Sequence, residues 1–98
     1  LFEYDIPHHT VISHRVKLPF LTASWRGLGL LPNVFARESF IDELAFEAKK
    51  DPLNFRLEHL PNTELGKRYK SALKEAADFS DWYNYREQPI AGRAKGVA

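Results

Sequence analysis

Six prolines limit where regular structure can form in this chain of 98 residues. A proline lacks a backbone N–H and disfavours helical backbone in the residue before it, so helices tend to begin at a proline or end before one. Three prolines lie in the first third of the chain, and three separate later segments: Pro7, Pro19, Pro32, Pro52, Pro61 and Pro89. The positions predict a helix-poor N-terminal part and a helical remainder that begins near residue 33.

The N-terminal part is expected to form a short β-arm, at about residues 10–25. Residues 10–18 are rich in β-branched side chains and partly alternate in character, which favours a strand. Residues 20–25 favour a shorter extended segment. Gly27 and Gly29 loosen the end of this part.

From Asn33 onward, the sequence predicts three to four helices, at about 34–49, 52–60, 64–79 and 81–87. Asn33 is the expected N-cap of the first, Asp51-Pro52 opens the second, and Asn62-Thr63 is expected to cap the third. Gly66 is expected to weaken the third helix by about 1 kcal/mol relative to alanine. Helices that follow a β-arm predict the α+β fold class.

The first predicted helix is amphipathic. Its apolar residues recur at helical spacing and favour one buried stripe: Phe40, Ile41, Leu44, Ala45 and Ala48. Its charged residues are expected to face solvent: Arg37, Glu38, Asp42, Glu43, Glu47 and Lys49. Glu38, Asp42 and Glu43 lie within helical reach of one another, as acid/base groups would. No histidine or cysteine accompanies them, so a solvated face is the simpler interpretation.

The composition argues against several classes of function. The length allows one small domain, and a net charge of +1 gives no electrostatic basis for binding nucleic acid or an anionic membrane. No apolar run approaches the roughly 20 residues of a membrane span. Without cysteine the chain can form no disulfide, iron–sulfur cluster or thiolate site, and its four histidines lack the spacing of metal ligands. A start at Leu1 and the lack of Met fit a segment of a longer chain, with trimming of a short tag or terminus as the alternative.

The main candidate site is the loop at residues 24–29, Ser-Trp-Arg-Gly-Leu-Gly. Gly27 and Gly29 allow positive φ and close approach of a ligand to the backbone. Arg26 can offer planar donors to an anion, and Trp25 offers a flat wall. Such a loop can line a pocket for a phosphate or a pterin group. A Gly-x-Gly pair is also common in ordinary turns, so a structural role is the alternative.

The loop resembles one found in the xanthine dehydrogenase and aldehyde oxidase superfamily, in the large, molybdopterin-binding subunit. Arg26, Gly27 and Gly29 match the arginine and glycines of that family's loop, and Trp25 replaces one aromatic residue by another. Leu28 stands where the family has phenylalanine.

The segments after the loop extend this resemblance and fit the isoquinoline 1-oxidoreductase beta-subunit type best. The next helix keeps Glu38, Glu43 and Ala45 in register, and Asp-Pro-Leu opens the helix after it. Residues 92–98 match a Gly-Arg-x-x-Gly-x-Ala pattern. The resemblance implies that residues 1–98 are a single fragment of a molybdopterin-binding domain, within a larger α/β subunit.

The resemblance also implies roles for the loop residues. Arg26, Gly27 and Gly29 would contact the cofactor, and Leu28 and Trp25 would lie on the substrate side. No catalytic residue is expected here, because the family's general base is a glutamate in a segment outside this chain.

The enzyme implied by the resemblance is a molybdenum hydroxylase, which oxidises an aldehyde or an N-heterocycle with water as the oxygen donor. Its cofactor would be of the molybdopterin type, with the cytosine dinucleotide form as one alternative. The implied partners are the remainder of the large subunit and an iron–sulfur subunit. The fragment alone is expected to be inactive and free of cofactor, and to be prone to self-association. The compartment, bacterial cytoplasm or periplasm, stays open.

An independent helical module that binds another protein is the alternative function. Its contact surface would be the aromatic group near the C-terminus, which otherwise is expected to be core or interface: Phe79, Trp82, Tyr83 and Tyr85.

Overall fold

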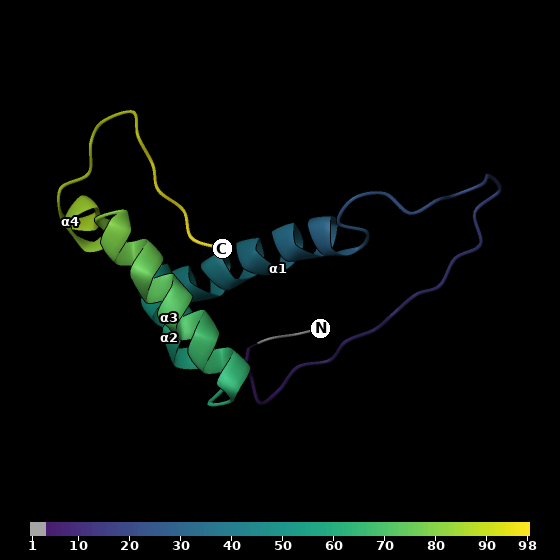
Figure 1. Cartoon of the computed structure of the whole chain (residues 1–98), viewed down its shortest axis with the longest axis horizontal. Coiled ribbons are helices and arrows are strands. Elements are labelled where there is room, and N and C mark those ends of the chain that lie inside the picture. The colour runs from purple at the N-terminus through teal and green to yellow at the C-terminus, as the bar shows by residue number, and fades with distance from the viewer. Residues whose placement is uncertain (1–3) are drawn as a thin grey trace.

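Residues 4–98, which are the part described by the computed structural model, form four α-helices. In chain order they are α1 (Leu30–Glu47), α2 (Pro52–His59), α3 (Glu64–Phe79) and α4 (Trp82–Glu87). Each helix packs on the next one along the chain. The three later helices form a body from which α1 projects, and the C-terminal tail curves back toward α1 (Figure 1).

An extended arm precedes α1. Residues 8–29 leave the helical body, turn back, and reach α1 at the end farthest from α4 (Figure 1). The radius of gyration is 16.5 Å, whereas a compact domain of this length has about 13 Å. The arm exposes a row of large apolar side chains: Val11, Ile12, Val16, Leu18, Phe20, Leu21 and Trp25.

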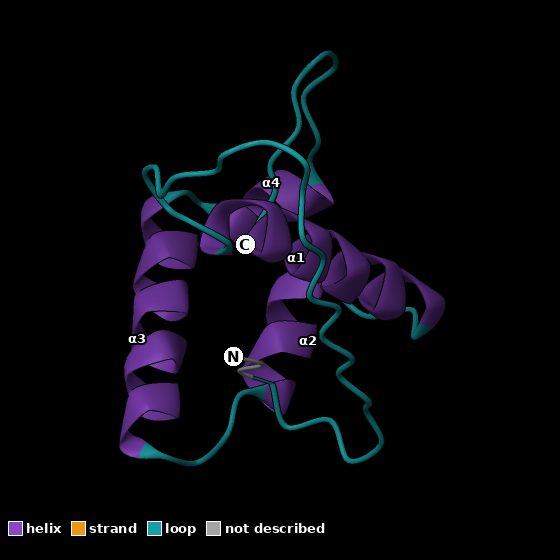
Figure 2. Ribbon diagram, turned by 90° about the vertical axis from the view of Figure 1, so that its right-hand side faces the viewer, coloured by secondary structure: helices purple, strands orange, loops and turns teal. Residues whose placement is uncertain are grey.

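The predicted β-arm at about 10–25, and with it the α+β fold class, is wrong. Between residues 4 and 98 the chain contains helices and loops but no strand (Figure 2). Among these residues, no backbone hydrogen bond joins the arm at 10–25 to another segment. An alternating pattern makes a segment suitable for a sheet, but a strand forms only where a neighbouring strand accepts and donates its hydrogen bonds.

The starts of α2 and α3 follow from local capping, as predicted. The Asp51 carboxylate accepts hydrogen bonds from the backbone N–H groups of Leu53 and Asn54, at 3.0 and 3.1 Å. Pro52 occupies the first turn of α2, where its missing N–H costs nothing. The Thr63 hydroxyl accepts from the N–H of Gly66 at 3.1 Å and caps α3.

The start of α1 differs from the prediction. The helix begins at Leu30, and Asn33 lies inside it and donates its side-chain N–H to the Gly29 carbonyl instead of acting as N-cap. Pro32 is therefore within the first turn. A proline is tolerated there because the first N–H groups of a helix have no partner inside the helix.

Two small apolar clusters hold the helices together. One joins Tyr4, near the N-terminus, to α1 and α2, and consists of Tyr4, Ile41, Ala45, Phe55 and Leu60. The other joins α2, α3 and α4 through Leu53, Ala77 and Trp82. Leu73 of α3 packs against both clusters. Of the predicted apolar stripe, Ile41 and Ala45 are buried and Leu44 is half-buried. Phe40 is 57% exposed, and Ala48, the C-cap residue of α1, is also exposed.

Gly66 is required by packing, which the sequence did not indicate. The residue is buried, and a Cβ at this position would lie 2.0 Å from the Pro61 carbonyl oxygen. No side chain fits at that distance, so the tight link between α2 and α3 depends on glycine here.

Candidate functional site

The candidate loop forms a turn that runs directly into α1. Residues 26–29 are in turn conformation, and the Leu30 N–H donates to the Gly27 carbonyl at 2.9 Å. All residues from 24 to 29 are exposed, with Trp25 at 87% and Leu28 at 64%. The structure therefore brings Trp25, Arg26, Gly27, Leu28 and Gly29 together at the free end of α1.

The two glycines of the turn differ in what they require. Gly27 has a φ of +76°, in the left-handed region that glycine adopts without strain. Gly29 has a φ of −73° and occupies the N-cap position of α1, so residues other than glycine can adopt the same backbone conformation there. Of the two glycines that allow positive φ, only Gly27 adopts it.

Leu28 carries backbone strain at the exposed tip of the turn. Its φ is +46°, and for a residue with a Cβ this conformation costs about 1 kcal/mol or more. Two successive residues with positive φ, Gly27 and Leu28, turn the chain sharply and leave the backbone of the turn accessible.

Arg26 provides an exposed positive charge in this turn. Its side chain is exposed, and among residues 4–98 it makes no hydrogen bond or ion pair. A free guanidinium beside accessible backbone suits an anionic group of a ligand, because it offers planar, paired N–H donors.

Behind the loop, α1 is held by a buried ionic network, and here the sequence interpretation was wrong. Glu38 was expected to face solvent, but it is 6% exposed, and its partner Arg56 of α2 is 0% exposed. The Arg56 Nε donates to Glu38 Oε2 at 3.1 Å, and an Arg56 terminal nitrogen donates to Asp42 Oδ1 at 2.6 Å. The Tyr4 hydroxyl also donates to Glu38 Oε2, at 2.8 Å. Glu38 and Asp42 of α1 therefore form a structural ion-pair network with Arg56 of α2.

The network shifts the ionisation of its members. Burial alone raises the pKa of Glu38, but hydrogen bonds from Arg37, Tyr4 and Arg56 outweigh it and hold the pKa below its ordinary value. Burial, and then the hydrogen bond to Glu38, raise the pKa of the Tyr4 phenol well above its ordinary value. Glu38 and Arg56 both stay charged near neutral pH, and every buried side-chain nitrogen and oxygen in residues 4–98 has a partner.

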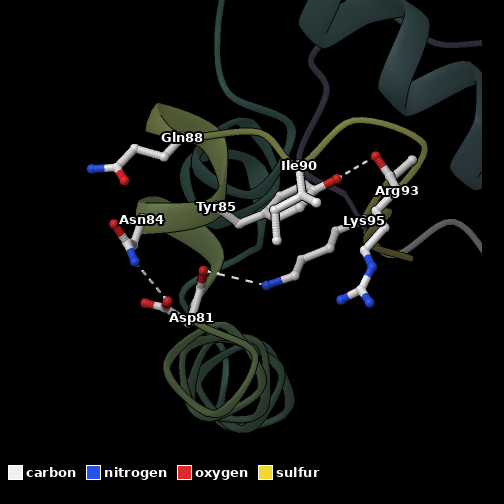
Figure 3. Close-up of a pocket in the computed structure, with 8 residues that line it drawn as sticks. Asp81, Asn84, Tyr85, Gln88, Ile90, Arg93 and Lys95 are labelled. Atoms are coloured by element: carbon white, nitrogen blue, oxygen red, sulfur yellow. Dashed lines mark hydrogen bonds between the residues drawn. The ribbon is translucent and has the colours of Figure 1, made fainter.

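The aromatic group near the C-terminus divides between core and surface. Trp82 is 4% exposed and joins the cluster that links α2, α3 and α4, whereas Phe79 is 96% exposed. A recess of about 520 Å³ lies between α4 and the tail, and Figure 3 shows its lining. There the Tyr85 hydroxyl donates to the Arg93 carbonyl, and the Lys95 ammonium lies 4.5 Å from the centre of the Tyr85 ring. These contacts hold the tail against α4.

Two further kinds of site do not occur in the part of the chain that the structure describes. Residues 4–98 contain no group of three histidine, cysteine, aspartate or glutamate side chains that could hold a metal ion. They also contain no helix whose length and apolar character would let it cross a membrane.

Two curated proteins match nearly all of this chain. A nicotinate dehydrogenase subunit of Pseudomonas putida (strain KT2440) is 38% identical over 94 residues, which are 95% of this chain and 7% of that protein. The beta subunit of isoquinoline 1-oxidoreductase from Brevundimonas diminuta is 30% identical over 95 residues, which are 97% of this chain and 12% of that protein. No family model and no solved structure matches the chain. The chain is therefore related in sequence to a short segment of two much longer oxidoreductase subunits.

Proposed function

We propose that residues 24–29 form one wall of the molybdopterin cofactor pocket in the large subunit of a molybdenum hydroxylase. The observation that carries the proposal is the similarity, over 94 and 95 residues, to segments of the nicotinate dehydrogenase and isoquinoline 1-oxidoreductase subunits. The names of both relatives refer to aromatic N-heterocycles. An N-heterocycle is therefore the substrate class that we propose, with aldehydes as the wider family alternative.

The loop suits contact with the organic part of such a cofactor. Arg26 would donate to an anionic group such as the pterin phosphate, and the exposed backbone at Gly27 and Gly29 would allow that group to approach closely. Trp25 and Leu28 would lie on the substrate side. When bound, the cofactor supplies the oxidation itself, with water as the oxygen donor. In this proposal the 98 residues supply binding and shape, and no catalytic group.

The exposed arm supports a place inside a larger subunit. Large apolar side chains at this level of exposure are usually covered by other protein. Val11, Val16 and Leu21 are 75%, 76% and 102% exposed, and they lie in the segment that leads to the loop. In this proposal the rest of the large subunit covers the arm and completes the pocket, and an iron–sulfur subunit accepts the electrons.

The proposal is tested in the protein expressed from its complete reading frame together with its partner subunits. Arg26→Ala is compared with Arg68→Ala, a control because Arg68 is an exposed arginine of α3, outside the arm. The measurements are molybdenum content, pterin content and oxidation of N-heterocycles such as nicotinate. We expect Arg26→Ala to lower cofactor content or activity, and Arg68→Ala to leave both near the wild-type values. Wild-type cofactor content and activity in Arg26→Ala would rule out a cofactor contact at Arg26.

A further inference from the structure

The buried residues that hold α1 against the rest of the protein lie far from the end of the helix that carries the loop. Within residues 4–98, the backbone of α1 comes close to that of α2 and not to those of α3 or α4. The buried residues of α1 are Glu38, Ile41 and Ala45, so none lies in the first two turns, which carry the loop. Figure 1 shows this half of α1 projecting from the helical body. The place of the loop therefore depends on the angle at which α1 leaves α2.

Two of the three anchors are apolar and lie far from the loop. Ile41 and Ala45 pack in the cluster with Phe55 and Leu60. Glu38 is the anchor nearest the loop, nine residues after Gly29, which corresponds to roughly 14 Å along a helix. Since apolar contacts are not directional, they leave the tilt of α1 less defined than a set of hydrogen bonds does.

Arg56 holds α1 at two points one helical turn apart. Its Nε donates to the Glu38 carboxylate at 3.1 Å, and one terminal nitrogen donates to the Glu38 carbonyl, also at 3.1 Å. The other terminal nitrogen donates to Asp42 at 2.6 Å and to the Pro52 carbonyl of its own helix at 3.1 Å. A planar guanidinium with fixed donors can hold both the rotation and the tilt of the helix it grips.

We infer that Arg56 of α2 is the positioning residue of the 24–29 loop. Through its hydrogen bonds to Glu38 and Asp42, Arg56 sets the angle between α1 and α2. That angle fixes the place of Trp25 and Arg26 relative to the other helices. What the loop binds rests on the proposed function, but the positioning by Arg56 does not. Arg56 acts through α1 and touches none of the loop residues.

The inference is tested by a distance measurement on the 98-residue chain. Because the sequence has no cysteine, Leu31→Cys on α1 and Glu58→Cys on α2 can be spin-labelled uniquely. Both positions are exposed, and Leu31 lies on the loop side of Glu38. Pulsed electron paramagnetic resonance then gives the distance distribution between α1 and α2. A tilt of about 15–20°, the ordinary scatter of helix packing, moves Leu31 by about 3 Å.

The labelled chain is compared in four forms: wild type, Arg56→Met, Arg56→Lys and Leu53→Ala. Leu53→Ala is the control, since it weakens the other apolar cluster, where Leu53 is 1% exposed, and leaves the network intact. We expect the distribution to shift or broaden by about 3 Å in Arg56→Met. The change should be smaller in Arg56→Lys, because lysine keeps the positive charge but lacks the planar set of N–H donors. The control should keep the wild-type distribution.

Arg56→Lys decides the result if circular dichroism shows that Arg56→Met is unfolded. A wild-type distribution in the folded arginine variants overturns the inference, and so does equal broadening in Leu53→Ala. No cofactor is present in this measurement, so its outcome is separate from the test of Arg26.

Discussion

The indole N–H of Trp82 donates to the Asp51 carboxylate at 3.1 Å, although the two residues are 31 positions apart. The same carboxylate caps α2 and lies 3.5 Å from the Arg86 side chain. One acidic side chain therefore both starts a helix and ties it to α4.

Replacing Asp51 should be costly because two functions are lost together. We expect Asp51→Ala to lower the free energy of unfolding by about 2–4 kcal/mol, the sum of a lost cap and an unpaired indole N–H. Asp51→Asn keeps an acceptor at the cap and should lose about 1 kcal/mol. Urea unfolding, monitored by circular dichroism, measures the free energy of unfolding of the two variants. An equal loss in Asp51→Ala and Asp51→Asn would contradict the view that Asp51 both caps α2 and binds Trp82.

Gly66 should resist a substitution that usually stabilises helices. Alanine is favoured over glycine in a helix by about 1 kcal/mol, but here its Cβ would meet the Pro61 carbonyl. We expect Gly66→Ala to destabilise the chain by about 1–3 kcal/mol, as overpacking does. Ala72→Gly, at an exposed position of the same helix, gives the ordinary preference of alanine over glycine for comparison. A stabilised Gly66→Ala protein would show that the link at Pro61 adjusts freely.

The buried ion pair should be costly to break from one side. We expect Arg56→Met to lower the free energy of unfolding by about 3–5 kcal/mol, because it leaves the Glu38 charge buried without its main partner. Replacing both residues, as in Glu38→Met/Arg56→Leu, should cost less than Arg56→Met alone. Chemical denaturation of the single and double variants checks the order, and a double variant less stable than Arg56→Met would contradict it.

The low pKa of Glu38 predicts how stability depends on pH. Since the folded chain holds this carboxyl ionised more strongly than the unfolded chain does, the stabilisation is fully present above the ordinary value of 4.5. It is lost as the pH falls below 4.5 and passes through the folded-state pKa. Urea unfolding from neutral to acidic pH should therefore show wild type losing more stability than Glu38→Gln. If the free energy of unfolding depends on pH in the same way in both proteins, the pKa of Glu38 is not lowered in the folded chain.

The two glycines of the loop should respond differently to alanine. Gly27→Ala forces a Cβ into positive φ and should cost about 1–2 kcal/mol, mostly as fraying of the first turn of α1. Gly29→Ala meets only an ordinary contact with the Asn33 side chain, 3.4 Å away, and should cost less. Amide hydrogen exchange at Leu30 and Asn33, whose N–H groups donate to the Gly27 and Gly29 carbonyls, reports this fraying. Similar exchange in both variants would show that the turn conformation does not matter.

The helix boundaries were predictable where short-range chemistry decides them. Asp51 and Thr63 bond to N–H groups two or three residues away, so their sequence neighbours were sufficient. The burial of Glu38 was not predictable from its neighbours, because its partner Arg56 is 18 positions away. The helical pattern alone does not distinguish a buried, paired glutamate from one that faces solvent.

The structure of the arm and the role of Gly66 also depend on contacts that secondary-structure preference does not describe. Residues 10–18 have the composition of a strand, but within residues 4–98 the sheet partner that a strand needs is missing. The clash at Gly66 depends on how the chain bends at Pro61, which helix preference does not describe. The turn at residues 26–29 is exposed, as a binding loop must be, and the roles of its residues stay predictions.

Leu73 touches both apolar clusters, and this has a consequence for how the chain melts. Neither cluster is large enough to be an independent folding unit, and a side chain shared between them makes the loss of one a loss for the other. Residues 52–87 and the second half of α1 should therefore unfold in a single cooperative transition, while the arm at 8–29 exchanges its amide protons freely before that transition begins.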